Sequence, residues 1–333
     1  MKLLILIAIL TIAAPVFSQD ESLTIGAVDF YGLNGFNVNQ IRAALPLREG
    51  DQLSRSSKVT AVKQIREAVK RATGHEPSDV ATICCDDRGR LLIYIGLRDE
   101  SVRQTIYNPS PRGSVLLPQA ALDVQRDAEQ AWLNAMKQGV TGEDDSRGYA
   151  LSLDPEARTK QLALHAYVVR HSLMVRRVLA SSRAVEHRRI AAEMLGYADR
   201  SPPQIAALIR ASHDVNDGVR NNAIRALVVL ARSSPEAAAI IPGECFVGLL
   251  NSGLWTDRNK SAELLAVLTA QRNPQLLTCL RQHALTSLIE MARWSNQGHA
   301  SGARLMLERI AITTQKNNRD NATCRRPLCS STR

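Results

Sequence analysis

Aromatic residues are scarce in this sequence: Phe, Trp and Tyr together make up 4% of its 333 residues, although apolar residues as a whole make up 45%. Packed β-sheets depend on aromatic and β-branched side chains, so this scarcity argues against a β-sandwich and favours helices packed on helices. The apolar fraction excludes a disordered chain, and six cysteines in this length exclude a small disulfide scaffold. The length suggests about two domains.

Short enzyme motifs are also missing. The sequence has no GxSxG, P-loop, HExxH or GxGxxG motif, no CxxC pair and no Cys/His spacing typical of zinc. The seven histidines lack a partner at metal-binding spacing, and the acidic run 143–145 lacks the alternating acids of a calcium loop. We therefore predict no catalytic residue, no metal site and no cofactor, and we favour a non-enzymatic role.

Long apolar runs are absent except at the start of the chain. Lys2 precedes an apolar run over residues 3–14, and Val16 and Ser18 are small residues typical of a cleavage site. The run is too short for a stable membrane span. We predict a signal peptide at 1–18, an exported protein that is periplasmic or extracellular, and no membrane span in the mature chain.

Export would place the cysteines in an oxidising compartment. The six cysteines are Cys84, Cys85, Cys245, Cys279, Cys324 and Cys329. Cys245 and Cys279 are a possible disulfide because they lie roughly one helical repeat apart, and Cys324 and Cys329 could close a small loop; Cys279 could instead be a buried apolar residue. The first two, adjacent in sequence, would point to opposite faces of a strand, so we expect them to be unpaired, buried side chains.

Residues 19–99 predict a small α/β domain with balanced charge, 11 basic and 11 acidic side chains. β-rich runs alternate with helical patterns, and Asp86–Gly89 is a hairpin turn between the last two runs. The expected elements, in β-α-α-β-β order, are 24–31, 37–45, 57–73, 80–85 and 91–97. Asn37 should cap the first helix, and Gly74 should end the second.

This domain resembles a POTRA domain, the small module of outer-membrane assembly and secretion proteins. The resemblance rests on the segments 28–32 (VDFYG) and 47–51 (LREGD) and on the hairpin that ends with 91–97. No barrel-like series of strands follows, so insertion into an outer membrane is not implied. The resemblance implies that an extended partner segment could add to an exposed edge of the sheet. The alternative is a domain that only packs against its neighbour.

Residues 100–119 contain three prolines and are predicted to be a connector. Helical patterning dominates residues 120–312. Residues 100–312 carry 25 basic and 20 acidic side chains, and the basic tail 313–333 is expected to be disordered. Small residues recur at an equivalent place in successive helical units. They are Ala192, Ala223, Ala262 and Ala303. A helical hairpin cannot bury its apolar face alone, so stacked neighbours must supply the core.

The helical units resemble HEAT repeats of the bilin-lyase type. The best matches are 187–196 and 214–223. In the second, Asp217, Val219-Arg220 and Ala223 follow the Asp, Val-Arg, Ala order of the family, with Val219 expected to be buried and Arg220 able to reach acids of neighbouring turns. The third unit departs from the pattern, since Arg258-Asn259 stands where Val-Arg is expected. The resemblance implies an all-α solenoid with a concave binding surface; an irregular TPR-like array is the structural alternative.

Arginines of these helices are the candidate partner-binding residues. They are Arg177, Arg188, Arg189, Arg220 and Arg225. On a concave face they would attract a protein partner, or an acidic surface or envelope polymer. We do not expect nucleic acid as the partner, because export argues against it and no aromatic residues interleave the arginines. The alternative to partner binding is that these arginines are solvated or paired with local acids. We therefore predict an exported interaction or scaffold protein, with an enzyme or enzyme subunit acting on an envelope substrate as the alternative function, and a spacer as a third.

Overall fold

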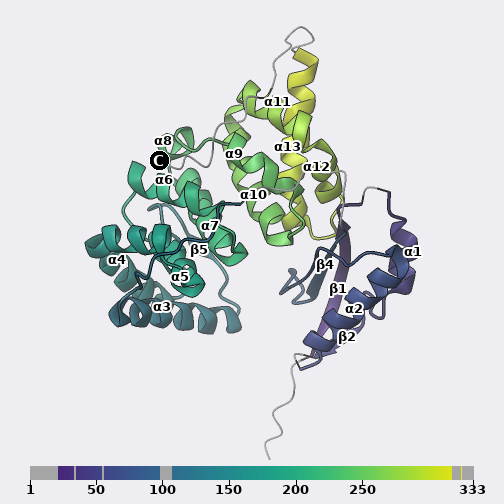
Figure 1. Ribbon diagram of the computed structural model, residues 1–333, viewed down its shortest axis with the longest axis horizontal. Helices are drawn as coiled ribbons and strands as arrows, with labels where there is room; N and C mark the ends of the chain where they lie inside the picture. Colours follow the sequence, from purple (N-terminus) through teal and green to yellow (C-terminus); the bar gives the residue numbers. More distant parts are fainter. Residues whose placement is uncertain (1–21, 34, 55, 98–106, 317–323, 325–333) are drawn as a thin grey trace, which may run out of the picture.

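The computed structural model describes residues 22–33, 35–54, 56–97, 107–316 and 324. The predicted signal peptide lies outside these residues. A small sheet with two helices lies beside a larger part built mainly of helices (Figure 1). This arrangement confirms the prediction of an α+β unit followed by a helical region. None of the helices described is both long enough and apolar enough to cross a membrane.

The sheet has four strands in the order β2-β1-β4-β3. The strands are β1 (Ser22–Tyr31), β2 (Gln52–Ser54), β3 (Asp79–Ile83) and β4 (Leu91–Gly96). The central strands β1 and β4 are parallel, and each edge strand is antiparallel to its neighbour. The β-α-α-β-β prediction therefore missed β2, because a three-residue strand is too short to show an alternating pattern.

The two helices of this unit begin and end where their capping residues lie. α1 (Val38–Ala44) follows Asn37, whose side chain accepts hydrogen bonds from the backbone N–H groups of Asn39 and Gln40. α2 (Lys58–Thr73) ends at Gly74, which has the left-handed conformation that glycine adopts without strain. Both ends agree with the sequence prediction.

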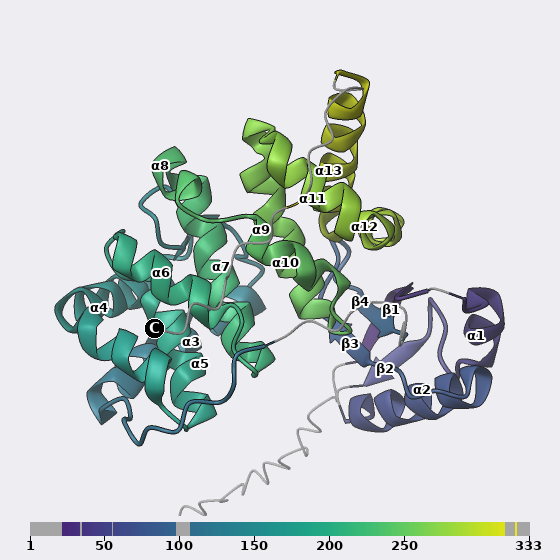
Figure 2. The ribbon, with the colours of Figure 1, turned by 45° about the horizontal axis from the view of Figure 1, so that its top comes forward.

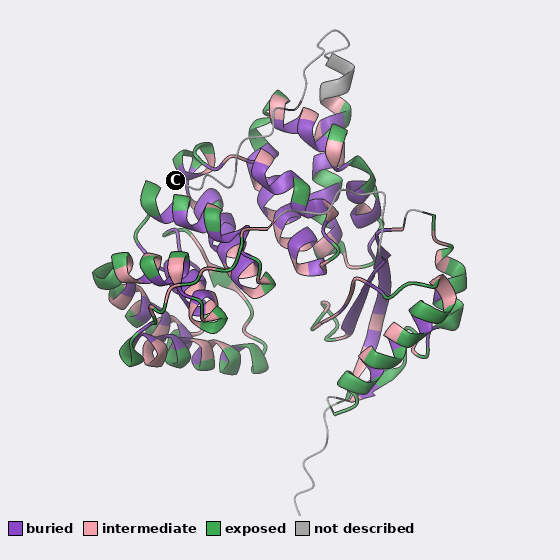
Figure 3. Cartoon of the chain, in the orientation of Figure 1, coloured by how far each residue is buried: buried purple, intermediate pink, exposed green. Residues whose placement is uncertain are grey.

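Both faces of the sheet are covered. A bulge between Ile25 and Ala27 in β1 changes the alternation, so that Ile25, Val28 and Phe30 pack under α1 and α2. The other face presents Tyr31 from β1 and Tyr94 from β4 to the helical part. Figure 1 shows α1 and α2 on the side of the sheet that faces away from the helices, and Figure 3 shows the central strands as largely buried, with β4 buried throughout. The sheet is thus a layer between two sets of helices.

The helical part begins at Gln119. Its longer helices are α3 (Gln119–Lys137), α4 (Pro155–Ser181), α5 (Val185–Leu195), α6 (Pro202–Ala211), α7 (Asp217–Ser233), α10 (Trp255–Leu268), α11 (Pro274–His283), α12 (Leu285–Ala292) and α13 (Gln297–Lys316). The short elements are β5 (Glu143–Asp144), β6 (Leu151–Ser152), α8 (Pro235–Ala239), α9 (Glu244–Val247), η1 (Gly248–Asn251) and η2 (Thr269–Gln271). α4 starts after Asp154, whose side chain accepts a hydrogen bond from the N–H of Ala157, with Pro155 as its first residue.

Helices α5, α7, α10 and α13 pack against one another in succession, as Figure 2 shows for α7, α10 and α13. The four alanines aligned in the sequence lie on these helices, and each is at most 2% exposed. At Gly302 on α13, an added Cβ would lie 3.0 Å from the carbonyl oxygen of Ala262 on α10. Small residues therefore allow the close approach that stacks the helices.

Residues 107–118, hereafter the strap, run along the loops that precede the stacked helices. The N–H of Asn108 donates to the carbonyl of His213 at 2.6 Å, and the N–H of Gly113 donates to the carbonyl of Ser181 at 2.8 Å. The N–H of Leu117 donates to Nδ1 of His187 at 3.0 Å. The described part of the predicted connector is therefore bonded to one loop after another along the helical part.

The disulfides differ from the predicted pairs. Cys279 on α11 bonds to Cys324, with the two Cα atoms 4.7 Å apart, so the proposed Cys245–Cys279 and Cys324–Cys329 pairings are wrong. Cys245 is also disulfide-bonded, and Cys329 lies outside the described residues. The pairing could not be deduced from spacing because it depends on the tail returning to α11, where the N–H of Cys324 donates to the Gln282 side chain.

The adjacent Cys84 and Cys85 form a disulfide as well. Both are exposed, in the turn that follows β3. The expectation of two unpaired, buried side chains is therefore wrong, because the strand ends at Ile83 and the alternation of a strand does not apply to these residues.

Candidate functional site

Two of the predicted partner-binding arginines are buried. Arg188 is 0% exposed and Arg220 is 1% exposed, so neither can present its charge to a partner at the surface. Each guanidinium instead makes two bonds to one carboxylate: Arg188 to Asp214 at 2.8 and 3.0 Å, and Arg220 to Asp257 at 2.8 and 2.9 Å. The expectation of an exposed position is wrong for these two residues, while the inference that Arg220 reaches an acid of a neighbouring turn is confirmed.

The same arrangement occurs a third time. Arg258 on α10 donates to the carboxylate of Glu290 on α12 at 3.1 Å. Each of the three arginines also donates to a carbonyl six positions earlier in the chain. We call Arg188, Arg220, Arg258 and their carboxylates the arginine ladder. It ties each helix to the loop before it and to the next unit, which is a structural role.

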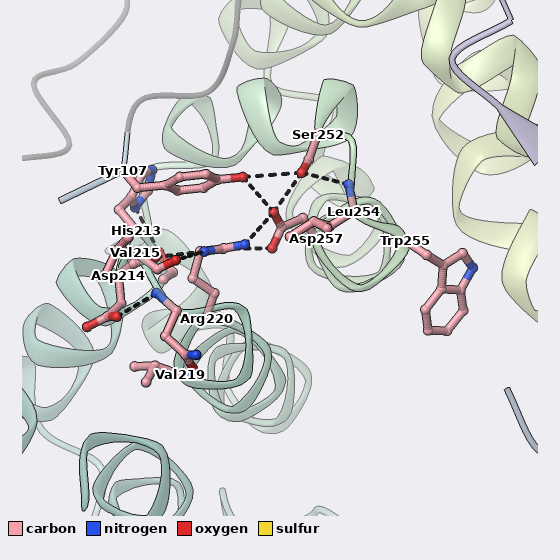
Figure 4. A network of polar contacts seen from close by, with 12 residues as sticks. Tyr107, His213, Asp214, Val215, Val219, Arg220, Ser252, Leu254, Trp255 and Asp257 are labelled. Atoms are coloured by element: carbon pink, nitrogen blue, oxygen red, sulfur yellow. Dashed lines mark hydrogen bonds and ion pairs between the residues drawn. The ribbon is translucent and has the colours of Figure 1, made fainter. Parts of the chain in front are cut away.

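The strap covers the ladder at Arg220. Figure 4 shows the guanidinium of Arg220 between the ring of Tyr107 and the carboxylate of Asp257, with its Cζ 4.0 Å from the ring centroid. The Tyr107 hydroxyl donates to Asp257 at 2.8 Å, and Ser252 donates to the same oxygen at 2.7 Å. Burial and the nearby Asp257 raise the pKa of Tyr107 to about 12, so the phenol keeps the proton that it donates.

The sheet covers the ladder at Arg258 in the same manner. The Cζ of Arg258 lies 4.8 Å from the centroid of the Tyr31 ring. Glu290 accepts from the backbone N–H groups of Gly32 and Leu33, each at 2.9 Å. Gly32 is required here because its φ is +70° and an added Cβ would meet the carbonyl of Leu97. The ladder thus ends on the backbone that follows β1.

A histidine lies between the sheet and the helices. His299 on α13 is bonded through Nδ1 to the Tyr94 hydroxyl at 2.7 Å and packs edge-on against the ring of Trp255. Burial and the nearby Lys260 lower the pKa of His299 to about 4, and the Glu263 carboxylate opposes this shift. The imidazole is therefore neutral at pH 7.

This pKa predicts a loss of stability in acid. Below the unfolded pKa of about 6.5, the unfolded chain takes up a proton at His299 that the folded chain refuses, so stability falls until the pH reaches about 4. We expect a loss of about 2 kcal/mol, discounted for partial exposure. Urea unfolding at pH 7 and pH 4.5 should show a smaller acid loss in His299→Gln than in the unmodified chain; equal losses would contradict the assignment.

The remaining candidate arginines are separated by the fold. Arg189 on α5 and Arg225 on α7 line one cavity of about 340 Å³, which we call the α3–α7 pocket. Residues of α3, α4, α5 and α7, the segment 143–150 and Lys260 of α10 form its wall. Arg177 is exposed on α4 and does not line this cavity. Sequence reasoning therefore found two residues of the pocket.

The pocket has charges of both signs, and its cations are paired. Arg225 bonds to the Glu143 carboxylate at 2.7 Å, and Lys260 lies 3.1 Å from Glu263. Arg189 bonds to Glu186 at 2.7 Å and lies 3.8 Å from Glu193. The basic excess of the chain is therefore not concentrated in this cavity.

Two carboxylates of the pocket share a neutral partner. The amide nitrogen of Gln125 donates to Glu129 at 3.0 Å and to Glu193 at 3.2 Å. Burial raises the pKa of Glu193, and the nearby Glu129 carboxylate adds to this shift. Trp132, one turn after Glu129 on α3, is partly exposed and lines the same cavity. These residues were missed because nothing in the sequence brings α3 beside α5.

Within the described ranges, no group of three or more His, Cys, Asp or Glu side chains could hold a metal ion. His213 is buried, with Nε2 3.1 Å from the carbonyl oxygen of Cys245. Its bonds join neighbouring units of the helical part.

Comparisons with known proteins give little information about this chain. No family model and no curated protein matches it. Among solved structures, a crystal structure of an engineered protein from a structural genomics consortium is similar at 17% identity; the match covers 58% of this chain and 90% of that one, with a TM-score of 0.39. Such a low score carries no argument about function.

Proposed function

We propose that this chain is an exported interaction protein, in which a POTRA-like unit and a HEAT-like helical array present binding surfaces to a protein partner of the cell envelope. One observation carries the proposal: the α3–α7 pocket is a cavity of about 340 Å³ whose wall is formed mainly by side chains of four helices, α3, α4, α5 and α7. This volume is within the range of ligand-binding clefts. It suits a few residues of an extended segment rather than a whole domain.

The walls of the pocket offer the contacts that a peptide needs. Trp132 and Tyr197 supply aromatic surface, and Asn221 and Asn222 of α7 supply amide donors and acceptors in the wall of the cavity. Asn222 already donates to the carbonyl of Arg189 at 3.1 Å, and its side-chain oxygen accepts from Asn221. An incoming backbone would exchange these local bonds for its own. Trp and Arg are the residue types that most often dominate binding energy.

Strand addition is a second mode of binding for the same function. β2 pairs only with Ser22–Thr24 of β1, and a hollow of about 470 Å³ lies beside Val28 further along that strand. The carboxylate of Glu49 occupies the N–H of Val28 there, at 3.2 Å. A partner strand would have to displace Glu49 to pair with β1. The enzyme alternative stays a prediction.

Loss of the tryptophan should remove partner binding through the pocket. We expect Trp132→Ala to reduce capture of a partner from an envelope extract about tenfold or more, because a buried aromatic anchor contributes about 2 kcal/mol or more to an interface. Capture would be measured by quantitative mass spectrometry on immobilised mature protein. The control is Val59→Ala on α2, where the side chain is 80% exposed and far along the chain; equal capture by both variants would overturn the proposal.

A further inference from the structure

The α3–α7 pocket has an excess of negative charge where α3 meets α5. Its three cations, Arg189, Arg225 and Lys260, each have a carboxylate within 3.1 Å: Glu186, Glu143 and Glu263, respectively. Glu129 makes no ion pair with any described residue, and Glu193 has only Arg189, at 3.8 Å. This is unexpected in a chain whose formal charge is +10.

Glu129 and Glu193 share one hydrogen-bond donor. The neutral N–H₂ group of Gln125 bonds to both of them, and the guanidinium that acts on both, that of Arg189, is already bonded to Glu186. Like charges that share one neutral donor repel each other, and burial of Glu193 increases the cost. A positive charge placed between Glu129 and Glu193 would remove this repulsion.

An aromatic surface stands beside the carboxylates. Trp132 lies three residues after Glu129, so both side chains leave α3 on the same side, and both line the cavity. Within the described part of the chain, no other ring and no cation stacks on Trp132, whereas both tyrosines of the arginine ladder, Tyr31 and Tyr107, are covered by a guanidinium. Indole is the aromatic group that attracts cations most strongly.

We propose that this end of the pocket binds the side chain of a lysine or arginine from an extended partner segment. The cation would sit between Glu129 and Glu193, and its alkyl stem would lie on Trp132. The inference rests on the proposed function, and it names the chemistry of the residue that the partner inserts. A small-molecule cation would be recognised by the same groups, but the amides of Asn221 and Asn222, which line the same cavity, favour a peptide.

The test follows the indole N–H of Trp132 by NMR while small probes are added to the full mature chain. The sequence has three tryptophans, and Trp132→Phe identifies the signal. The probes are the Nα-acetyl methylamides of lysine, of norleucine, which has the same stem without the charge, and of glutamate. We expect lysine to shift the signal in a saturable manner, about tenfold more tightly than norleucine.

Variants separate the carboxylates from general effects of charge. The double change Glu129→Gln with Glu193→Gln should weaken the lysine probe about tenfold, whereas Glu67→Gln, an exposed residue of α2, should leave it unchanged. Gln keeps the shape and the hydrogen bonding of the pocket, and an unchanged circular dichroism spectrum would confirm folding.

Three results would overturn the inference: equal affinity for lysine and norleucine, a double variant that binds lysine as well as the unmodified chain, or a tighter response to glutamate, which would assign the pocket to an acidic residue through Arg225 and Lys260. None of them affects the capture test with Trp132→Ala. Conversely, if Trp132→Ala captured as much partner as the unmodified chain, the proposed function would be overturned. A saturable response to the lysine probe would still support the cation site in that case.

Discussion

Replacing Asp257 with alanine should lower the free energy of unfolding by about 3–5 kcal/mol, because it leaves the buried charge of Arg220 without its carboxylate. Both partners are 1% exposed, so water cannot replace the lost bonds. The hydroxyl groups of Tyr107 and Ser252 lose their acceptor at the same time. Urea unfolding followed by circular dichroism at pH 7 would measure the change.

Two comparisons make the Asp257 result specific. Glu186→Ala removes an ion pair whose acid is 63% exposed, and such pairs contribute less than about 1 kcal/mol. The double change Arg220→Met with Asp257→Leu removes both buried charges and should recover most of the lost stability, since apolar replacements of a buried pair are often neutral. A loss for Asp257→Ala no larger than that for Glu186→Ala would contradict the role given to the ladder.

Glu290→Ala should be comparably destabilising, by about 3–5 kcal/mol, and should also loosen the sheet. The carboxylate accepts from Arg258 and from the N–H groups of Gly32 and Leu33, so its loss affects both parts of the chain. Hydrogen exchange should accelerate at Gly32 and Leu33 more than at amides of α5. This pattern distinguishes a local release of the sheet from a general loss of stability.

Glu290→Gln is the matched variant. It keeps one acceptor oxygen for the backbone but loses the charge that faces Arg258, so its effect should be intermediate, about half that of the alanine variant. If exchange at Gly32 and Leu33 stayed unchanged in both variants, the contact between the ladder and the sheet would not matter for stability.

Local features of the fold could be predicted from the sequence because they depend on neighbouring residues. Asn37, Gly74 and Asp154 mark helix ends through caps that act within one turn. The aligned alanines predicted stacking because a close helix approach requires a small residue. β2 escaped detection since its pairing with Thr24 comes from the fold and not from a pattern of its own.

The candidate site was predicted less well, for a physical reason. A charged side chain looks the same in sequence whether it is solvated or buried with a partner, so Arg188 and Arg220 were expected at the surface. Arg258 continues the ladder even though the residues around it depart from the repeat pattern, because only its distance to Ser252 and Glu290 matters. Glu129 meets Glu193 only after α3 has packed beside α5.

The position of the sheet has a consequence for synthesis. Its strands are made first, yet the face that carries Tyr31 and Tyr94 is covered by Trp255 and Trp294, which belong to the last third of the chain. During synthesis this apolar face would therefore stay uncovered until the ribosome had added the residues up to Trp294. Contacts so distant in sequence form slowly. A premature stop codon before Trp255 would therefore leave this face of the sheet uncovered and prone to aggregation, and a chaperone that bound the strands during synthesis would protect it.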